Sequence, residues 1–308
     1  MTESLRALLT GLIDYAGLFP PAKLPLPEAL TNHVRYRASA DDWMLGRFIC
    51  PAARLSEFVA LEHLLQSGPA LVVSALGRGG ATADEFLAGL ATDLADLTAC
   101  RQRHGGRVVI DVMELRLPHF LYQCTAVDGA AVLTRSVPGP LSLFFETPSP
   151  DRETLSSLVR SMRVAFSGRP AGFKLRTGGL EPAAFPSCEE IAFALSASLA
   201  AGVPFKATAG LHHPFPRFDP TIGTRMHGFI NLFTAGVLIH ARGIGADRTC
   251  AILEDNEPTH FRFTDAGLEW QELTASPEEI VRARRTVLSF GSCSFDEPRD
   301  DLRALGWL

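Results

Sequence analysis

The sequence contains no C-x-x-C pair. Its six cysteines are scattered along 308 residues, and this spacing is not typical of a zinc site or of a disulfide framework. The simplest expectation for such thiols is a reduced, cytoplasmic setting.

The sequence also lacks a basic cluster and a long apolar run. The formal net charge is −5 and the pI is about 6.0, which argues against nucleic acid or an anionic membrane surface as a partner. No apolar run reaches the roughly 18 residues that a membrane span needs. The first 17 residues carry little positive charge and have an interrupted apolar run, so we expect neither a signal peptide nor a membrane association.

Apolar runs alternate with helix-like segments about seven times along the chain. The hydrophobic content of 46% is enough for one large domain. Continuous apolar strands are typical of a parallel sheet that is covered on both faces. The predicted strands are 43–51, 70–77, 107–115 and 139–148, followed by two short strands within 171–214 that carry Lys174 and Lys206. We therefore predict an α/β fold of the (β/α)8 TIM-barrel type.

An open, doubly wound sheet is the alternative fold. That fold normally has a glycine-rich first strand-to-helix turn, and the GRGG run at 77–80 lacks the required context.

The two ends of the chain are harder to interpret. Residues 4–13 suit a helix or the approach to a first strand, and the proline- and glycine-rich residues 14–27 predict a loop. We interpret 1–308 as a single barrel domain in which 246–308 form an irregular C-terminal extension. This extension contains a predicted β-hairpin at 260–271. The eighth strand is sought near 290–298, and its position stays open.

Two lysines give the strongest functional signal. Lys174 and Lys206 stand at the C-terminal ends of consecutive predicted strands, the rim where parallel α/β folds bind ligands. We expect each lysine to lower the pKa of the other, and a partly neutral lysine attacks carbonyl groups. The alternative is that both are anchors for phosphate or carboxylate, or are paired with acids.

Further polar side chains follow the predicted strands. They are Asp111, Glu114, Glu146, Arg176 and Thr208; near the N-terminus, Asp14 and Tyr15 precede a loop. Acids at this rim suit general acid–base work. Asp111 equally suits a structural partner of a basic residue, and Glu146 equally suits a helix cap or a partner of Arg176.

The loops after the two lysine strands offer other candidates. Thr177 and Gly178 follow the first strand, and Gly210 follows the second; their backbone N–H groups could bind an anion or simply form tight turns. His212 and His213 are adjacent, which disfavours joint binding of one metal ion, and a site needs three or more ligands. Near the C-terminus, the GSCS run at 291–294 could bind an anion and Cys293 could be reactive, but no base stands beside Cys293 in sequence, so we favour a plain loop there.

These motifs resemble a known family. Residues 174–178, KLRTG, resemble the Lys-Thr-Ser-Thr-Gly motif on the sixth strand of deoxyribose-phosphate aldolases. Residues 205–211, FKATAGL, resemble that family's seventh-strand motif, Val-Lys-Ala-Ser-Gly-Gly-Ile. Residues 109–112, VIDV, resemble the strand that carries its proton-relay aspartate. The resemblance implies a (β/α)8 barrel of the class I aldolase type.

The resemblance also implies residue roles. Lys174 becomes the imine-forming amine, Lys206 the neighbour that depresses its pKa, and Asp111 the proton shuttle, with Glu146 as a reserve acid or base. We expect Arg176 to bind an anionic group of the substrate because its guanidinium matches carboxylates and phosphates.

The sequence therefore predicts a lyase that acts on a small anionic carbonyl compound without a cofactor or a metal. The substrate contacts are predicted to be Arg176, Thr177, Gly178, Thr208, Gly210, His212 and His213. Two alternatives stay open: a metal-dependent lyase or isomerase built on Glu146, Asp111 and the two histidines, and a non-catalytic anion-binding barrel. The partner is a small molecule, and a homo-oligomer stays open.

Overall fold

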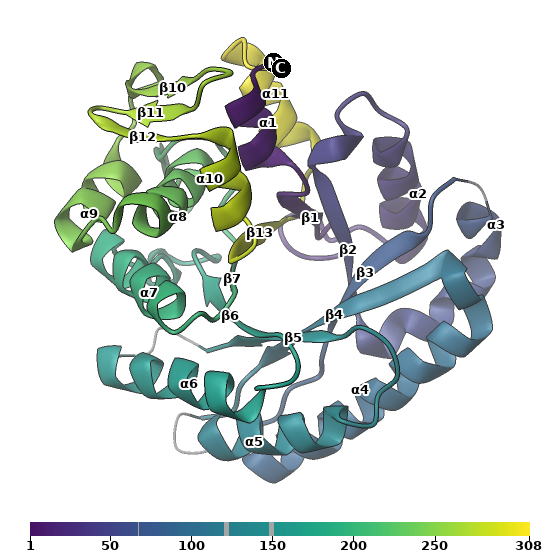
Figure 1. The fold of residues 1–308 in the computed structure, drawn as a ribbon. Helices are drawn as coiled ribbons and strands as arrows, with labels where there is room; N and C mark the ends of the chain where they lie inside the picture. Colours follow the sequence, from purple (N-terminus) through teal and green to yellow (C-terminus); the bar gives the residue numbers. More distant parts are fainter. Residues whose placement is uncertain (67, 120–122, 148–150) are drawn as a thin grey trace.

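The computed structural model describes residues 1–66, 68–119, 123–147 and 151–308. Eight parallel strands close into a barrel, and helices surround it (Figure 1). The strands run around the barrel in the order β1-β13-β7-β6-β5-β4-β3-β2. Their bounds are β1 Ile13–Tyr15, β2 Leu45–Pro51, β3 Leu71–Leu76, β4 Val108–Arg116, β5 Ser142–Glu146, β6 Ala171–Arg176, β7 Phe205–Thr208 and β13 Val287–Ser292. The predicted TIM-barrel fold is confirmed.

The strand β13 is the eighth strand that the sequence left open. It pairs in parallel with β7 on one side and with β1 on the other. The C-terminal part of the chain therefore closes the barrel against its N-terminal part, and β13 begins three residues before the segment in which the strand was sought.

Helices connect the barrel strands and form the outer layer. Their bounds are α1 Glu3–Leu9, α2 Leu26–Arg37, α3 Glu62–Leu65, α4 Ala83–His104, α5 Gln123–Thr134, α6 Arg152–Ala165, α7 Cys188–Ala200, α8 Phe229–Arg242, α9 Ala246–Glu254, α10 Pro277–Ala283 and α11 Asp296–Ala304. A 3-10 helix, Ala52–Leu61, precedes α3. Pro148 and Pro150, which the sequence places at the end of β5 and the start of α6, lie outside the described residues.

Capping motifs explain where several helices begin. Thr82 caps α4, Ser187 caps α7 and Ser276 caps α10, and in each case a glutamate three residues later completes a capping box. These short polar signals fix the start of each helix. For α4 and α7, which follow barrel strands β3 and β6, they also set the length of the loop at the barrel rim.

The segment 246–308 is not irregular, so this prediction was wrong. It holds α9, α10, α11 and the barrel strand β13. The predicted hairpin is present as β10 Phe261–Phe263 and β11 Leu268–Trp270, and a third strand, β12 Leu273–Ala275, extends it into an antiparallel sheet beside α8 and α9 (Figure 1). Elements this short show too few periods in the sequence to be recognised.

Two other short elements also differ from the predictions. The first barrel strand covers 13–15, so Asp14 and Tyr15 belong to β1 and not to the loop that follows. A second hairpin, β8 Arg217–Asp219 and β9 Thr224–Met226, precedes α8. Each of these strands has three residues, too few to show the alternation that identifies a strand in a sequence.

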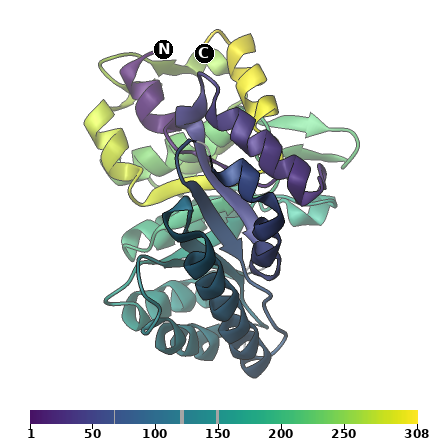
Figure 2. The same ribbon diagram turned by 90° about the vertical axis from the view of Figure 1, so that its right-hand side faces the viewer.

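The two ends of the chain lie at the same end of the molecule (Figures 1 and 2). The backbone N–H of Glu3 donates to Asp265 Oδ1 at 3.0 Å, and that of Ser4 donates to the carbonyl of Thr264 at 3.3 Å. These bonds attach α1 to the turn of the C-terminal hairpin. Among the helices that the structure describes, none combines the length and the apolar character needed to cross a membrane.

Candidate active site inside the barrel

The two lysines of the sequence prediction lie side by side. The Cα atoms of Lys174 on β6 and Lys206 on β7 are register partners, and both side chains are buried. They are two of only three lysines in the chain; the third is Lys23, which is exposed. Two of the three lysines of the protein therefore lie next to each other inside the barrel.

Three carboxylates surround these ammonium groups. Lys174 Nζ lies 2.7 Å from Glu114 Oε2 and 2.8 Å from Glu146 Oε2. Lys206 Nζ lies 2.6 Å from Glu114 Oε1 and 2.8 Å from Asp14 Oδ2. Glu114 thus bridges the two lysines, and the ion pairs form a continuous chain from Asp14 on β1 to Glu146 on β5. We call these five residues the charge cluster.

All eight barrel strands contribute either a residue of the charge cluster or a hydrogen bond to it. The five charged residues come from β1, β4, β5, β6 and β7. Ser74 on β3 donates its hydroxyl to Glu114 at 2.8 Å, and Ser289 on β13 donates to Asp14 at 2.7 Å. The strand β2 contributes the backbone N–H of Arg47, which donates to Asp14 at 2.6 Å. Such convergence requires a closed barrel, because these strands are distant in sequence.

The cluster is costly to bury. The exposed fraction of its five side chains ranges from 0% to 8%. Removing charges from water costs several kcal/mol per ion unless pairing and hydrogen bonds are nearly complete. With three carboxylates and two ammonium groups the cluster carries a formal charge of −1. A barrel interior is normally filled with apolar side chains, so this cluster is the candidate functional site.

The expected mutual lowering of the lysine pKa values does not occur. Burial alone lowers the pKa of Lys174, but attraction by Glu114 and Glu146 outweighs it and raises this pKa above the ordinary value. Burial likewise lowers the pKa of Lys206, and Asp14 and Glu114 outweigh it. The prediction was wrong because carboxylates from strands across the barrel reach both ammonium groups. At neutral pH both lysines are therefore protonated.

The pKa of Glu114 moves in the opposite direction. Burial raises the pKa of this carboxyl, and the two lysines together lower it well below its usual range. A carboxylate this strongly held accepts a proton only when one of its lysines changes charge. Glu114 is thus suited to pass a proton between Lys174 and Lys206.

Asp111, the predicted proton shuttle, is engaged elsewhere. The guanidinium of Arg47 holds it through two hydrogen bonds of 2.7 Å. Asp111 lies three residues before Glu114 on β4, nearer the N-terminal end of the strand, and β4 is irregular there: Ile110 and Val112 pair with consecutive residues of β3. The structure gives the position next to the lysines to Glu114, so the assignment of Asp111 as the relay is corrected.

The charge cluster has one end near solvent. Arg176, two residues after Lys174, donates through Nε to Glu146 Oε1 at 3.1 Å, and its side chain is 48% exposed. The other end is closed, since Asp14 is fully buried. A molecule arriving at the carboxyl ends of the strands therefore meets Arg176, then Glu146, then Lys174.

Other predicted substrate contacts have internal partners. Thr177 is fully buried and donates its hydroxyl to the carbonyl of Ala209 at 2.6 Å. A Cβ at Gly178 would lie 2.7 Å from the Cα of Gly210, so the two loops touch through their backbones. Thr208 is partly exposed at the end of β7. The glycines are therefore explained by close packing, and their role as anion ligands stays a prediction.

Substituting Gly210 tests this packing. Gly210 has φ +73°, and an added Cβ would come within 2.9 Å of the Cα of Gly178. Gly202 has φ +64° and no neighbour within 4 Å of such a Cβ. We expect Gly202→Ala to cost about 1 kcal/mol of stability, and Gly210→Ala to cost a further ~1–3 kcal/mol from overpacking. Urea unfolding measures both, and equal losses would contradict the packing account.

The two histidines point to a second group of residues. His212 Nδ1 donates to Glu297 Oε2 at 3.1 Å, and His213 Nδ1 donates to Asp301 Oδ2 at 2.5 Å. Both acids lie on α11. Neither histidine contacts the charge cluster through these bonds, so their role in substrate binding stays a prediction.

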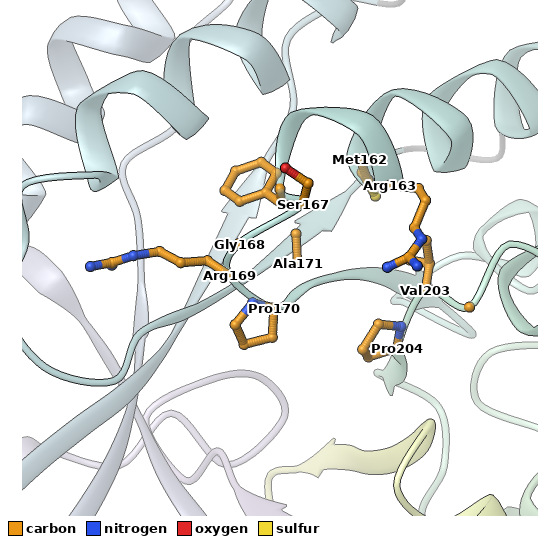
Figure 3. Close-up of a pocket in the computed structure, with 11 residues that line it drawn as sticks. Met162, Arg163, Ser167, Gly168, Arg169, Pro170, Ala171, Val203 and Pro204 are labelled. Atoms are coloured by element: carbon orange, nitrogen blue, oxygen red, sulfur yellow. The ribbon is translucent and has the colours of Figure 1, made fainter.

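A possible metal-ligand group and a pocket also lie away from the charge cluster. In the described ranges, three or more metal-ligating side chains converge at Cys188, Glu189 and Cys250, outside the barrel. A pocket of about 370 Å³ opens between the end of α6 and the starts of β6 and β7. This is the N-terminal end of the barrel, opposite the rim. Figure 3 shows Arg163 lying over this pocket while Arg169 extends away from it. Neither the possible metal-ligand group nor the pocket includes Lys174 or Lys206.

Sequence reasoning identified the lysines but gave less weight to two of their partners. Glu114 was among the rim candidates but was set aside for Asp111, and Asp14 was assigned to the start of a loop. A usable signal was present in the scarcity of lysine: the chain has 26 arginines and three lysines. Where arginine supplies nearly all other positive charge, two lysines at the ends of consecutive strands stand out as candidates for a role that arginine does not fill.

No family model matches the chain, and no curated protein matches it. The resemblance to the deoxyribose-phosphate aldolases therefore stays a prediction that rests on the motif residues.

Proposed function

We propose that the protein is a cofactor-independent carbon–carbon lyase that forms an imine between Lys174 and a small anionic carbonyl compound. The observation that carries the proposal is the placement of the Lys174 ammonium between Glu114 and Glu146, with Glu114 shared by Lys206. Such an arrangement combines a nucleophile, the amine, with two buried carboxylates that can accept and return its protons.

The carboxylates have opposite effects on the two stages of the reaction. They hold Lys174 protonated, which slows the first attack on a carbonyl carbon. Imine formation then converts an ammonium and a carbonyl into a protonated imine and water, so the positive charge stays on the same nitrogen. The carboxylates that stabilise the ammonium also stabilise the iminium, as preorganised electrostatic catalysis requires.

The residues then have distinct roles. When the carbon–carbon bond of the bound compound breaks, its electron pair moves into the iminium and gives an enamine. A proton from the departing hydroxyl passes to Glu146, the carboxylate nearest the rim. Glu114 exchanges protons between Lys174 and Lys206, and Arg176 binds the anionic group of the substrate.

Lys174 is assigned as the nucleophile in preference to Lys206. Lys206 is enclosed by Asp14 and Glu114, both buried. Lys174 contacts Glu146, which contacts the half-exposed Arg176. A carbonyl compound held by Arg176 therefore reaches Lys174 first.

The alternatives receive less support. An anion-binding barrel needs unpaired positive charge, whereas the lysines already face three carboxylates. A metal site at the rim needs converging ligands, and within the described ranges that convergence is found at Cys188 on the outside. A reduced, cytoplasmic setting belongs to the same proposal, supported by six free thiols.

The pH dependence of imine trapping tests the electrostatic part of the proposal. The raised pKa of Lys174 keeps the neutral amine a small fraction at pH 7, and this fraction grows about ten-fold per pH unit below the pKa. We expect the initial rate of adduct formation with a reactive carbonyl compound and cyanoborohydride to rise steadily from pH 7 to pH 9. A plateau near pH 8 would indicate a depressed pKa and would contradict this account.

Lys23 provides the reference within the same sample. It is exposed in the loop between β1 and α2, so its adduct gives the pH response of a surface amine with the same reagent. The ratio of the Lys174 adduct to the Lys23 adduct should not fall between pH 7 and pH 9.

A further inference from the structure

A cysteine and a histidine meet at the carboxyl ends of the barrel strands. Cys293 directly follows Ser292, the last residue of β13, and His212 lies in the loop after β7. The strands β13 and β7 are paired neighbours, so residues that follow them emerge side by side. Cys293 Sγ lies 3.9 Å from His212 Nδ1. The sequence prediction of a plain loop at Cys293 missed this because the histidine is 81 residues away.

Short hydrogen bonds fix both partners. The hydroxyl of Ser292 donates to the carbonyl of Ser294 at 2.7 Å, which defines the turn around Cys293. Glu297, at the start of α11, donates its backbone N–H to Ser294 Oγ at 3.1 Å. Its carboxylate accepts from His212 at 3.1 Å. The thiol, the imidazole and the carboxylate are thus held in one arrangement by the β13–α11 turn.

A positive charge lies beside the sulfur. Burial alone lowers the pKa of His212, but its contacts with Cys293 and Glu297 raise it to about 10. An imidazolium is therefore present beside the sulfur at neutral pH. Reactive cysteines are characteristically found in partly exposed positions beside a positive charge, because that charge stabilises the thiolate that attacks.

Other titratable groups surround the pair. Tyr15 approaches from β1, and burial raises its pKa, so it is neutral at neutral pH. His213 lies beside His212 and is held by Asp301 and Glu297 on α11. Asp296, the first residue of α11, is engaged by Tyr36 and Arg299. The carboxylates on this side of the pair thus each have a partner of their own.

The other cysteines offer a contrast. Burial raises the pKa of Cys50 to about 12 and that of Cys100 to about 11, and it also raises the pKa of Cys188 and Cys250. Cys124 is exposed, and its sulfur accepts a hydrogen bond from a serine hydroxyl. Cys124 is therefore an accessible thiol for comparison.

We propose that Cys293 is the reactive thiol of this protein, paired with His212, and that it takes soft carbon electrophiles such as unsaturated or halogenated carbonyl compounds. With iodoacetamide the thiol gives its proton to solvent, the thiolate beside the His212 imidazolium attacks the CH2 carbon, the C–S bond forms, and the C–I bond breaks to release iodide. The inference is independent of the proposed lyase activity, because it concerns a different group of residues and needs no substrate.

Site-resolved alkylation tests the proposal on the intact chain. The protein is treated with limiting iodoacetamide at pH 6, quenched and digested, and the alkylated fraction of each cysteine is measured by mass spectrometry. We expect Cys293 to react about ten-fold faster than Cys124, because an ordinary thiol with a pKa of about 8.5 is almost fully protonated at pH 6. The difference should narrow at pH 9. In 6 M urea, which removes the fold, the two rates should become equal.

Two variants distinguish the effect of His212 on the Cys293 rate from the effect of removing any histidine. His212→Asn should lower the Cys293 rate at pH 6 about ten-fold and leave Cys124 unchanged, while His240→Asn, at an exposed histidine of α8, should change neither rate. Equal rates for Cys293 and Cys124 in the folded wild type would overturn the proposal. So would a folded His212→Asn variant that keeps the fast reaction. If that variant does not fold, the wild type decides: the roughly ten-fold excess of the Cys293 rate over the Cys124 rate at pH 6 should disappear in 6 M urea.

Discussion

Replacing Glu114 with glutamine is expected to lower the free energy of unfolding by about 3–5 kcal/mol, the usual cost of breaking a buried ion pair by removing one partner. Glu114 is fully buried and holds Lys174 at 2.7 Å and Lys206 at 2.6 Å. The variant leaves two ammonium groups with Asp14 and Glu146 alone. For a chain of this size the loss corresponds to a fall in melting temperature of roughly 10 °C.

A matched substitution controls for the chemistry of the change. Glu57 pairs with Arg54 at 2.8 Å, but its side chain is 47% exposed. Glu57→Gln should cost less than about 1 kcal/mol, because exposed ion pairs contribute little. Similar losses for the two variants would show that the buried cluster contributes no more than a surface pair.

The effect of Glu114 should also survive mild acid. A carboxyl whose pKa is lowered in the folded state contributes stability above its unfolded pKa of about 4.3, and this stability is lost only as the pH falls through the folded value. The pKa of Glu114 lies well below the ordinary range. The difference between wild type and Glu114→Gln should therefore be as large at pH 5 as at pH 7.

Replacing Lys174 with methionine is expected to abolish the imine adduct with any carbonyl compound that labels the barrel of the wild type. The substitution removes the only amine that lies between Glu114 and Glu146 among the described residues. The wild type and the variant are incubated with the compound and cyanoborohydride, and the mass of each intact protein is compared. An undiminished adduct in the variant would contradict the assignment of Lys174.

Lys206→Met provides the closest control. It removes the same type of residue from the same buried cluster and makes the same change in charge. We expect the adduct to form more slowly in this variant but to remain, because Lys206 exchanges protons and does not attack the carbonyl carbon. If both variants lose the adduct completely, circular dichroism must show that both are folded before the loss is assigned to chemistry.

The barrel could be predicted because its strands are local patterns. The runs at 70–77 and 107–115 are mainly apolar, and each overlaps a barrel strand. The pairing of Lys174 with Lys206 follows from the same logic, since consecutive strands of a parallel barrel are neighbours.

The carboxylates could not be predicted in the same way. Asp14 lies on a strand of three residues beside a proline-rich loop, which hides the strand signal. Asp111 and Glu114 share one strand, and an irregularity at the start of that strand changes which residues meet the lysines. Such an irregularity is a property of the pairing with β3, and the sequence of β4 does not contain it.

The partnership of His212 with Cys293 has the same origin. It depends on β13 lying next to β7, and the position of the eighth strand could not be read from the sequence. Closure of the barrel brings these residues together, so their chemistry emerges from the fold and not from any local motif.

The measurement that tests the central claim most directly is reductive trapping on the wild-type protein, with the adduct assigned to a residue. The protein is incubated with a panel of small aldehydes, ketones and 2-oxo acids, reduced with borohydride and digested. Because the chain has only three lysines, the assignment is simple. The account predicts that at least one anionic carbonyl compound labels Lys174 in clear excess over the exposed Lys23, with Lys206 unlabelled. Labelling confined to Lys23 and the N-terminus across the panel would contradict it.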